Sequence, residues 1–312
     1  GNNVYFIENM YINPTNVCEA DCGFCGFKRK PGEEGAYTMD EAALLKYVSD
    51  RWNDNIREFH IVGGHNHEVP FDYYLDTIRT LKKHYPQATV KAYTGAEIEF
   101  FSRIAGISMK EVLEELIKAG LDTMPGGGAE ILTERYRLKM SPDKASTDQW
   151  LEAHEIAHGL GLKTHATMLY GSIESFEERL IHMDRLRQLQ DRTNGYMVFI
   201  PLAMQPRSIN AGLKRRTSAF DDMRTVAISR LMLDNFDHIK AYWINIGVQL
   251  TQMALTFGSD DIHGTLIEER ISHAVGALTS SGITRDELIH LIKTAGRTPV
   301  ERDTFYNIVK QY

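Results

Sequence analysis

Short runs of β-branched and aromatic residues alternate with longer amphipathic segments along most of the 312-residue chain. This alternation predicts strands joined by helical crossovers, and therefore a parallel sheet. The predicted strands are Val4–Ile12, Glu58–Val62, Thr89–Tyr93, Thr123–Met124, Lys163–Leu169, Tyr196–Ile200, His238–Ile246 and Met253–Phe257. About eight strand–helix units predict an α/β fold, a TIM-like barrel that is complete or partly open.

Four of the predicted helices begin with a hydroxyl residue that is followed three positions later by an acid. This is the capping-box pattern, in which the two side chains satisfy each other's backbone N–H groups. The four pairs are Thr38 with Glu41, Ser108 with Glu111, Ser175 with Glu178 and Thr284 with Glu287. In the second of these helices, the apolar stripe from Val112 to Ile117 ends at Gly120, a typical C-terminal stop.

No proline- and glycine-rich linker, repeat or low-complexity tract divides the chain. We therefore expect a single domain, with a barrel core over residues 1–260, a loop over 13–30 that carries the cysteines, and a C-terminal helical extension over 261–312. The chain begins Gly-Asn-Asn without an initiator methionine, so we expect that an N-terminal segment was trimmed or that a tag residue remains.

Composition narrows the class of protein. Hydrophobic residues make up 43% and charged residues 25%, as in ordinary globular proteins. A net charge of −7, without a basic run that contains aromatic residues, argues against nucleic-acid binding. No apolar stretch approaches the ~18 residues that cross a membrane, and no signal peptide is visible. We therefore expect a cytoplasmic protein with no membrane partner.

The three cysteines of the chain, Cys18, Cys22 and Cys25, lie within eight residues. Cysteine thiolates hold iron–sulfur clusters, usually four per cluster. Three thiolates at C-x-x-x-C-x-x-C spacing would leave one iron of a four-iron cluster open to a small molecule. Structural zinc needs a fourth ligand, and the nearest histidine, His60, is distant in sequence. A disulfide would leave one thiol over, and a simple electron carrier normally needs a fourth cysteine.

Distinctive residues fall where each predicted strand runs into its helix, which is where barrel enzymes carry their active sites. After the first strand come the cysteines, and the later junctions hold Gly63-Gly64-His65, Thr94 to Glu97, Pro125 to Gly128, Tyr170 to Glu174, Pro201-Leu202 and Asn245 to Gly247. Their convergence on one rim predicts a single site.

The cysteine motif, with Phe24 before its last cysteine, and the barrel pattern together resemble the radical S-adenosylmethionine superfamily. The resemblance implies a 4Fe–4S cluster held by the three cysteines, and S-adenosylmethionine chelated by the open iron. Longer segments look like the aminofutalosine synthases of the futalosine route to menaquinone, among them HIVGGHNHEVPFDYYLDTIR, TGAEIEFFSRIAGIS, DTMPGGGAEIL and GRTPVERDTFY. This resemblance covers essentially the whole chain, although the helical N-terminal extension that is usual in the family is missing.

That resemblance implies a reaction in which a 5′-deoxyadenosyl radical adds to the alkene of 3-[(1-carboxyvinyl)oxy]benzoate. Rearrangement and loss of carboxylate then give 6-amino-6-deoxyfutalosine, bicarbonate and methionine, so S-adenosylmethionine is consumed as a substrate. An electron donor such as flavodoxin or ferredoxin is also implied. Two other hypotheses stay open. One is a dehypoxanthine futalosine cyclase, which abstracts hydrogen and releases free deoxyadenosine. The other is a noncatalytic metal-binding module.

The resemblance also assigns roles around the cofactor, and each has an ordinary structural alternative. Gly63 and Gly64 would form a bare backbone ledge for the methionine amino group, because glycine has no Cβ, or a simple turn. Thr94 and Glu97 would contact the ribose hydroxyls, or cap a helix. Further cofactor contacts are expected from Phe24, Met168, Tyr170 and Gly171, although an apolar strand end is more often part of the core.

The implied substrate carries two carboxylates, which arginine and histidine are suited to bind. Gly126, Gly127 and Gly128 would offer a flat backbone surface near the substrate, or form a mobile turn. Glu130 would meet a cofactor hydroxyl or a basic side chain. The candidates for the carboxylates are His65, His67, Arg137, His165 and Arg207, with weaker ones at Asn245 and Gln249. His154, His158 and His182 fall on predicted helices and are expected to be surface or packing residues.

Overall fold

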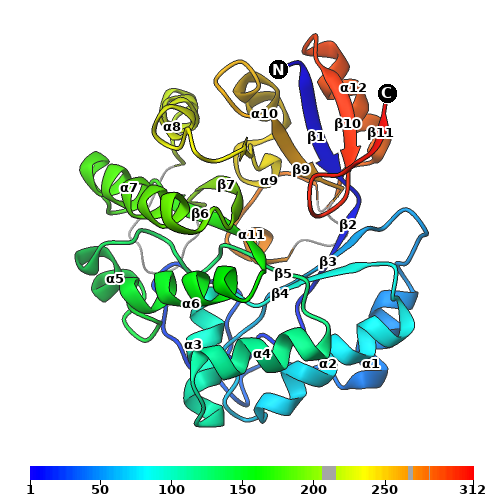
Figure 1. The fold of residues 1–312 in the computed structure, drawn as a ribbon, viewed down its shortest axis with the longest axis vertical. Coiled ribbons are helices and arrows are strands. Elements are labelled where there is room, and N and C mark those ends of the chain that lie inside the picture. The colour runs from blue at the N-terminus through cyan, green and yellow to red at the C-terminus, as the bar shows by residue number, and fades with distance from the viewer. Residues whose placement is uncertain (206–215, 266–269, 281) are drawn as a thin grey trace.

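The structure is a computed structural model that describes residues 1–205, 216–265, 270–280 and 282–312. Its centre is a seven-stranded parallel sheet in the order β2-β3-β4-β5-β6-β7-β8, with helices on its outer side (Figure 1). The strands are β2 (Asn9–Ile12), β3 (Glu58–Ile61), β4 (Thr89–Ala92), β5 (Thr123–Met124), β6 (Lys163–Tyr170), β7 (Tyr196–Ala203) and β8 (His238–Ile239).

Within the described ranges, eight helices connect these strands and cover the outer face of the sheet. They are α1 (Glu41–Ser49), α2 (Phe71–His84), α3 (Gly95–Ala105), α4 (Met109–Ala119), α5 (Glu134–Met140), α6 (Thr147–Gly159), α7 (Phe176–Thr193) and α8 (Ala219–Met232). The main hydrophobic cores lie between helices and sheet: Ile61 and Ile78 belong to one, Phe199 and Leu186 to another. Outward-facing strand residues are therefore apolar, which leaves the inward-facing ones free to be polar.

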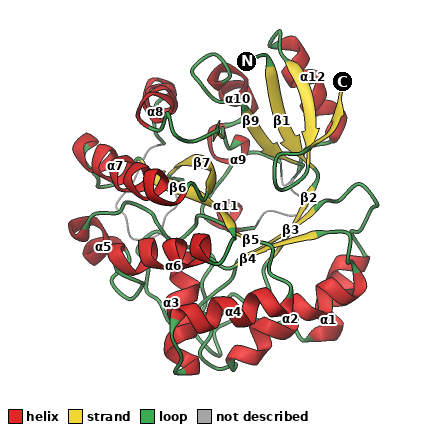
Figure 2. Ribbon diagram, in the orientation of Figure 1, coloured by secondary structure: helices red, strands yellow, loops and turns green. Residues whose placement is uncertain are grey.

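A second, four-stranded sheet closes the barrel. Its order is β11-β10-β1-β9, and its strands are β1 (Asn3–Ile7), β9 (Asp261–Gly264), β10 (Thr298–Arg302) and β11 (Ile308–Gln311). β1 runs on into β2 after Glu8 and pairs in parallel with β9 and β10. β9 also meets β8: the amide of Asp260 donates to the carbonyl of Ile239 at 3.0 Å. The strand order thus continues from β8 through β9 to β1, which confirms the TIM-like barrel (Figure 2).

Four further helices complete the C-terminal part: α9 (Trp243–Ile246), α10 (Val248–Ala254), α11 (Ile271–Ala274) and α12 (Arg285–Thr294). Packing of α12 buries Leu288 and Ile292 beside Val4 and Phe6 of β1. Among the described residues, the model contains no helix with the length and apolar character that a membrane span requires.

Two strand predictions are wrong in the last third of the chain. The predicted strand His238–Ile246 ends at Ile239, because α9 begins at Trp243. Met253–Phe257 lies at the end of α10 and in the turn after it, and the last barrel strand is β9 instead. β9 reads Asp-Ile-His-Gly, which carries no apolar strand pattern, because its Asp261 and His263 side chains belong to a buried polar layer.

The expected boundary between barrel core and helical extension is wrong for the same reason. Residue 260 directly precedes β9, so the barrel core extends past it. The segment 261–312 contains α12, as expected, but also β10 and β11, and β10 pairs with β1 along four residues. The two ends of the chain therefore share one sheet, and the C-terminal segment is part of the barrel wall.

Three of the four predicted capping boxes are confirmed, those that begin at Ser108, Ser175 and Thr284. The fourth is wrong, because Asp40 caps α1 and its side chain accepts a hydrogen bond from the amide of Ala43. Thr38 instead meets the hydroxyl of Thr15 at 3.1 Å, within the loop that carries the cysteines.

Candidate functional site

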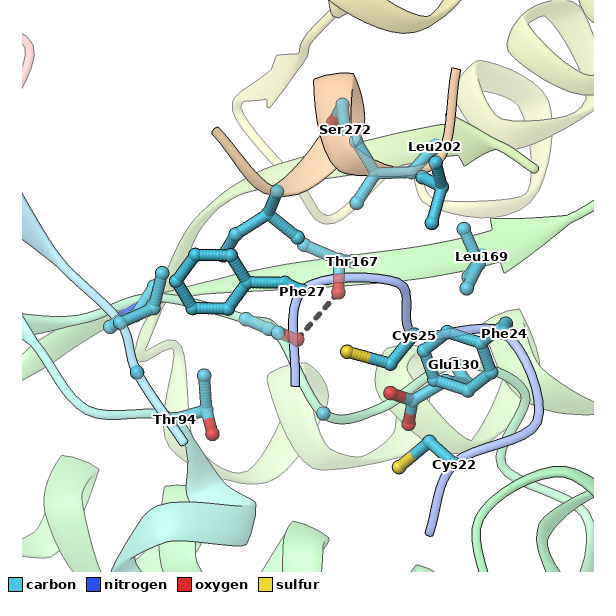
Figure 3. Close-up of a pocket in the computed structure, with 18 of the residues that line it drawn as sticks. Cys22, Phe24, Cys25, Phe27, Thr94, Glu130, Thr167, Leu169, Leu202 and Ser272 are labelled. Carbon is cyan, nitrogen blue, oxygen red and sulfur yellow. Dashed lines mark hydrogen bonds between the residues drawn. The ribbon is translucent and has the colours of Figure 1, made fainter. Parts of the chain in front are cut away.

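A pocket of about 300 Å³ lies at the end of the barrel where the strands run into the following loops. All three cysteines line it, and so do residues from every strand–loop junction between β2 and β9. Figure 3 shows the thiols of Cys22 and Cys25 pointing into this space, with Thr94 and Thr167 among the residues around them. The predicted convergence on one rim is thus found for the junctions after β2, β3, β4, β5, β7 and β8, whereas the segment from Tyr170 to Glu174 after β6 does not line the pocket. The volume falls at the small end of the range for ligand pockets.

The cysteine loop is tied to the segment after β3 by backbone hydrogen bonds. The amide of Gly64 donates to the carbonyl of Thr15 at 3.0 Å, and the amide of Glu19 donates to that of His65 at 2.9 Å. A Cβ atom added at Gly64 would lie 2.0 Å from the carbonyl oxygen of Val17. Gly64 therefore has a packing reason to be glycine. Its role as a ledge for the cofactor, together with Gly63, stays a prediction.

The thiols of Cys18, Cys22 and Cys25 are free, and the first two are buried. Burial raises the pKa of Cys18 and raises that of Cys22 to about 11, while the nearby Lys144 acts in the opposite direction. In the described parts of the chain, no three Cys, His, Asp or Glu side chains converge on a point that suits a single metal ion. A multinuclear cluster instead spreads its thiolates over several irons, and three free thiols on one pocket wall are the donor set that it takes.

Lys144 is a partly buried cation at this wall, 16% exposed, that the sequence pattern did not reveal. Its Nζ lies 3.1 Å from Oε1 of Glu130 and 5.6 Å from the centre of the Phe24 ring. Burial acts to lower the pKa of Lys144, but Cys22 and Glu130 raise it overall. The lysine stands alone in the run Ser-Pro-Asp-Lys-Ala-Ser, which contains no motif from which its place could be predicted.

Thr94 and Glu97 both line the pocket and form the capping box of α3. Glu97 accepts hydrogen bonds from the amide of Thr94 at 2.7 Å and from the amide of Gly63 at 3.3 Å. Burial raises the pKa of Glu97 to about 7, although these amides counteract it. The structural alternative for this pair is therefore confirmed, and ribose contacts stay a prediction.

The glycines at 126–128 line the pocket as a turn clamped by side-chain hydrogen bonds. The guanidinium of Arg137 donates to the carbonyls of Gly128 and Ala129, at 3.1 and 3.0 Å, and the indole of Trp150 donates to that of Gly127 at 3.0 Å. Arg137 is buried behind this turn and does not line the pocket. Its expected contact with a substrate carboxylate is therefore wrong, because the side chain does not reach the pocket and its two terminal nitrogens donate to backbone carbonyls.

The expected cofactor contacts on β6 fall on the wrong face of the strand. His165, Thr167 and Leu169 point into the pocket, whereas Met168 and Tyr170 belong to the core under α7 and α8. The physical reason is that side chains alternate between the two faces of a strand.

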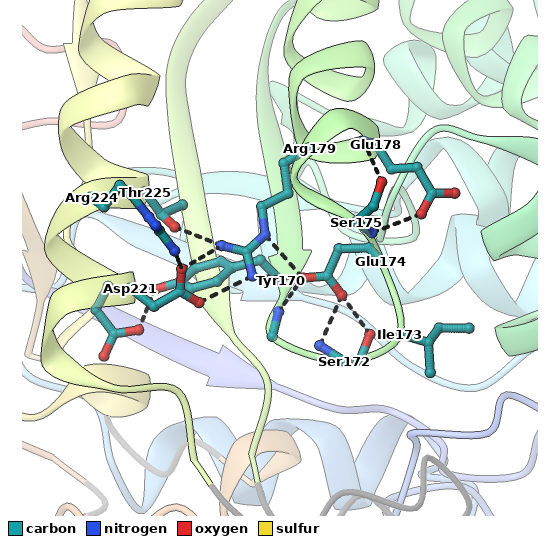
Figure 4. A network of polar contacts seen from close by, with 12 residues as sticks. Tyr170, Ser172, Ile173, Glu174, Ser175, Glu178, Arg179, Asp221, Arg224 and Thr225 are labelled. Carbon is teal, nitrogen blue, oxygen red and sulfur yellow. Dashed lines mark hydrogen bonds and ion pairs between the residues drawn. The ribbon is translucent and has the colours of Figure 1, made fainter.

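Gly171 lies outside the pocket as well, at a positive φ of 93°. The Tyr170 hydroxyl donates to Asp222 at 2.8 Å. Figure 4 shows Arg179 bridging Glu174 and Asp221 at this corner. The predicted packing of the Met168 and Tyr170 side chains on an adenine ring is therefore wrong in this structure, whereas the contact expected of Gly171 stays a prediction.

The remaining substrate candidates divide into two groups. His65, His165 and Asn245 line the pocket, as does Phe24, whereas His67 and Gln249 do not. Burial lowers the pKa of His65 to about 3, so this imidazole is neutral. The side chain of Asn245 donates to the carbonyl of Ala203 at 2.7 Å. Arg207 lies outside the described residues.

The three histidines expected to be packing residues are confirmed as such, because His154, His158 and His182 lie buried or nearly so among helices and strands. Sequence analysis missed the deep end of the pocket. There the walls are formed by Tyr11 of β2, His60 of β3, Tyr242 after β8 and His263 of β9.

Comparisons with known proteins agree with this geometry. Residues 12–186 match the model of the radical SAM superfamily, and residues 193–311 match that of the CofH/MqnC C-terminal region. The chain is 49% identical to an aminodeoxyfutalosine synthase of Thermus thermophilus, over 99% of this chain and 84% of the relative. It is 36% identical to a cyclic dehypoxanthine futalosine synthase of Halalkalibacterium halodurans, over 98% of this chain and 82% of the relative. A crystal structure of methylornithine synthase, 14% identical, superposes with a TM-score of 0.73 over 96% of this chain and 84% of that one.

Proposed function

The chain belongs to the radical SAM superfamily, and on that premise we propose that it catalyses the aminodeoxyfutalosine synthase reaction. In this reaction S-adenosylmethionine and 3-[(1-carboxyvinyl)oxy]benzoate give 6-amino-6-deoxyfutalosine, methionine and bicarbonate, as a step of menaquinone biosynthesis. The observation that carries the proposal is the 49% identity to an aminodeoxyfutalosine synthase over 99% of the chain. The cyclase relative is matched over a similar length but with 36% identity.

Cys18, Cys22 and Cys25 form the C-x-x-x-C-x-x-C motif with which the superfamily holds its 4Fe–4S cluster. When bound, the cluster supplies the electron that cleaves a carbon–sulfur bond of S-adenosylmethionine. The residues of this chain hold the cluster and shield the reacting groups from water. The backbone around Gly64 fixes the cysteine loop against the end of β3, and Lys144 places a positive charge beside the thiolates. A reactive carbon-centred species needs a partner within about 3–3.5 Å, which a pocket of this size can provide.

The walls of the pocket are suited to exclude water and side reactions. Leu169 and Leu202 line it from β6 and β7, and Phe24 closes it from the cysteine loop. The clamped turn at 126–128 presents backbone without side chains next to this space, so a flat aromatic acid can approach closely. We also propose a cytoplasmic location, since reduced thiols persist in a reducing compartment, and a small reductant protein of the flavodoxin or ferredoxin class as electron donor.

The test uses chain reconstituted anaerobically with iron and sulfide and supplied with a chemical reductant. Mass analysis of the products from 3-[(1-carboxyvinyl)oxy]benzoate should find an adenine-containing adduct with the mass of 6-amino-6-deoxyfutalosine. The variant Cys22→Ser should form none, while His290→Gln, on the exposed side of α12, should match the unmodified chain.

Two other results would overturn the proposal. Stoichiometric free 5′-deoxyadenosine, formed with dehypoxanthine futalosine and not with the enol ether, would identify a cyclase. Bound zinc without any cleavage of S-adenosylmethionine would identify a noncatalytic metal module.

A further inference from the structure

The inside of the barrel below the pocket holds charged side chains, where most TIM barrels are filled by branched aliphatic residues. The residues concerned are Glu58, Lys91, Lys240, Asp261 and Arg302, each no more than 1% exposed. Lys91 pairs with Glu58 at 2.5 Å, and Arg302 pairs with Asp261 at 2.7 Å. Taking charges out of water is costly even when they are paired, so this layer calls for an explanation beyond packing.

The buried layer carries three cationic groups and two carboxylates, so one cation is in excess. That cation is Lys240. Its Nζ lies 3.8 Å from Asp261, whose carboxylate already accepts hydrogen bonds from Arg302 and from the hydroxyl of Tyr306, each at 2.7 Å. Burial, together with the positive charges of Arg302 and Lys91, lowers the pKa of Lys240 to about 7. Within the described residues, the layer therefore lacks one negative charge.

A layer of histidine and tyrosine side chains separates these charges from the pocket. Nζ of Lys240 lies 3.3 Å from Nδ1 of His263, and Nε2 of His263 lies 3.0 Å from the hydroxyl of Tyr11. Tyr11 in turn stacks on the ring of His60 at 4.3 Å. His60, His165 and His263 all line the pocket. The excess positive charge is therefore one layer of side chains away from any ligand at the deep end.

Two of these histidines have polar atoms without a partner. Nδ1 of His60 and Nε2 of His165 are buried without a hydrogen bond to the described residues, so the ring nitrogens that can reach a ligand are Nε2 of His60 and Nδ1 of His165, which also make none to these residues. Burial and the charges of Lys91 and Lys240 lower the pKa of both histidines well below the usual value, so the rings are neutral. A neutral imidazole carries one N–H donor. The deep end thus offers two unused donors in front of an unbalanced positive charge.

We propose that His60 and His165, with the cation Lys240 behind them, bind the ring carboxylate of an aromatic acid. This inference rests on the proposed function and deepens it, since it fixes which way the substrate lies. The alkene of the enol ether has to be near the cysteines at the rim, which places the carboxylate on the far side of the ring toward the deep end. The other carboxylate of the substrate is attached to the alkene and therefore lies at the rim, where Lys144 lines the pocket.

The test compares 3-hydroxybenzoate with 3-hydroxybenzamide, which has the same shape without the charge. Isothermal titration of the reconstituted protein should show the acid binding at least ~10-fold more tightly, as expected for a hydrogen bond to a charged group. His165→Leu, His60→Leu and Lys240→Met should each reduce that preference without weakening the amide. His165→Gln, which keeps a donor, should retain part of it, and the exposed His290→Gln should change nothing. Thermal unfolding of each variant checks that it is folded.

Equal affinity for acid and amide in the unmodified protein would overturn the inference, and so would variants that keep the full preference. These results are separate from those that test the proposed function. If the enol ether is converted but the acid is not preferred, the carboxylate site fails and the function stands. If the acid is preferred through these histidines but no adenine-containing adduct forms, the function fails and the carboxylate site stands.

Discussion

At the scale of single residues, the wall that carries the thiols depends on one partly buried cation. Lys144 is close enough to Cys22 and Glu130 for their charges to interact. Binding a cluster requires deprotonated thiolates and so adds negative charge to this wall, which Lys144 offsets. Lys144→Met should therefore weaken cluster incorporation, by the ~10–100-fold that is typical when a residue supporting metal ligands is lost. Iron and sulfide content after anaerobic reconstitution measures the effect.

Lys139→Met is the matched control for this prediction. Lys139 is exposed on α5, so its loss removes the same charge without touching the pocket. Lys144→Arg keeps the charge and should retain most of the iron. Normal iron content in Lys144→Met, together with an unchanged circular dichroism spectrum, would show that the thiol wall needs no counter-charge.

At the scale of elements, the cysteine loop depends on how closely it approaches the end of β3. A methyl group at position 64 has no room, because the nearest atom, the carbonyl oxygen of Val17, lies 2.0 Å from the Cβ position. Gly64→Ala should force the loop outward and destabilise the protein by about 1–3 kcal/mol, as overpacking usually does. It should also lower iron uptake. Gly159→Ala, at the end of α6 with no atom within 4 Å of the Cβ position, should be neutral or stabilising by up to ~1 kcal/mol.

Urea denaturation with iron analysis separates two possible effects of Gly64→Ala. Loss of both stability and iron would mean that the loop contact supports the fold and the thiols together. If Gly64→Ala behaves like Gly159→Ala in both measurements, the close approach is not needed in solution.

The elements that sequence could predict are those whose residues obey a hydrophobic period. Strands β3, β4 and β6 each have an apolar outer face, so their positions are confirmed. β9 was missed because its inward residues, Asp261 and His263, belong to the charged layer and the histidine layer, where burial is polar. The apolar run at 253–257 resembles a strand in sequence, because short apolar runs do not distinguish a strand from a buried helix end.

The alternation of side chains along β6 follows from the sequence and determines which of its residues can face the site. Since His165 was expected to face the pocket, Thr167 and Leu169 had to face it as well, and Met168 had to face away. Lys144 and Arg137 are different cases. Both lie outside the strands, and the direction of their side chains follows from tertiary packing, which no local pattern encodes.

At the scale of the whole molecule, the barrel holds its excess charge at a cost in stability. Lys240 has a pKa of about 7 in the folded protein, against 10.5 for an ordinary lysine. Between these values the unfolded chain binds more protons than the folded one, so the contribution of this group makes stability rise with pH. Below pH 7 both states are protonated, and the full cost of burying the charge is present.

Lys240→Met removes this cost and should stabilise the protein at pH 6.5, by an amount on the order of a few kcal/mol at ~1.4 kcal/mol per pKa unit. Asp261 keeps Arg302 and Tyr306 as partners, so the substitution leaves no carboxylate unpaired. The gain should shrink as the pH rises toward 10. Asp261→Asn is the opposite change: it leaves Arg302 unpaired and should cost about 3–5 kcal/mol. Urea unfolding at pH 6.5 and 9.5 measures all three proteins. The opposite result, a Lys240→Met variant that is less stable than the parent at pH 6.5, would contradict this prediction. It would mean that the charge of Lys240 is already balanced by another group in the folded protein.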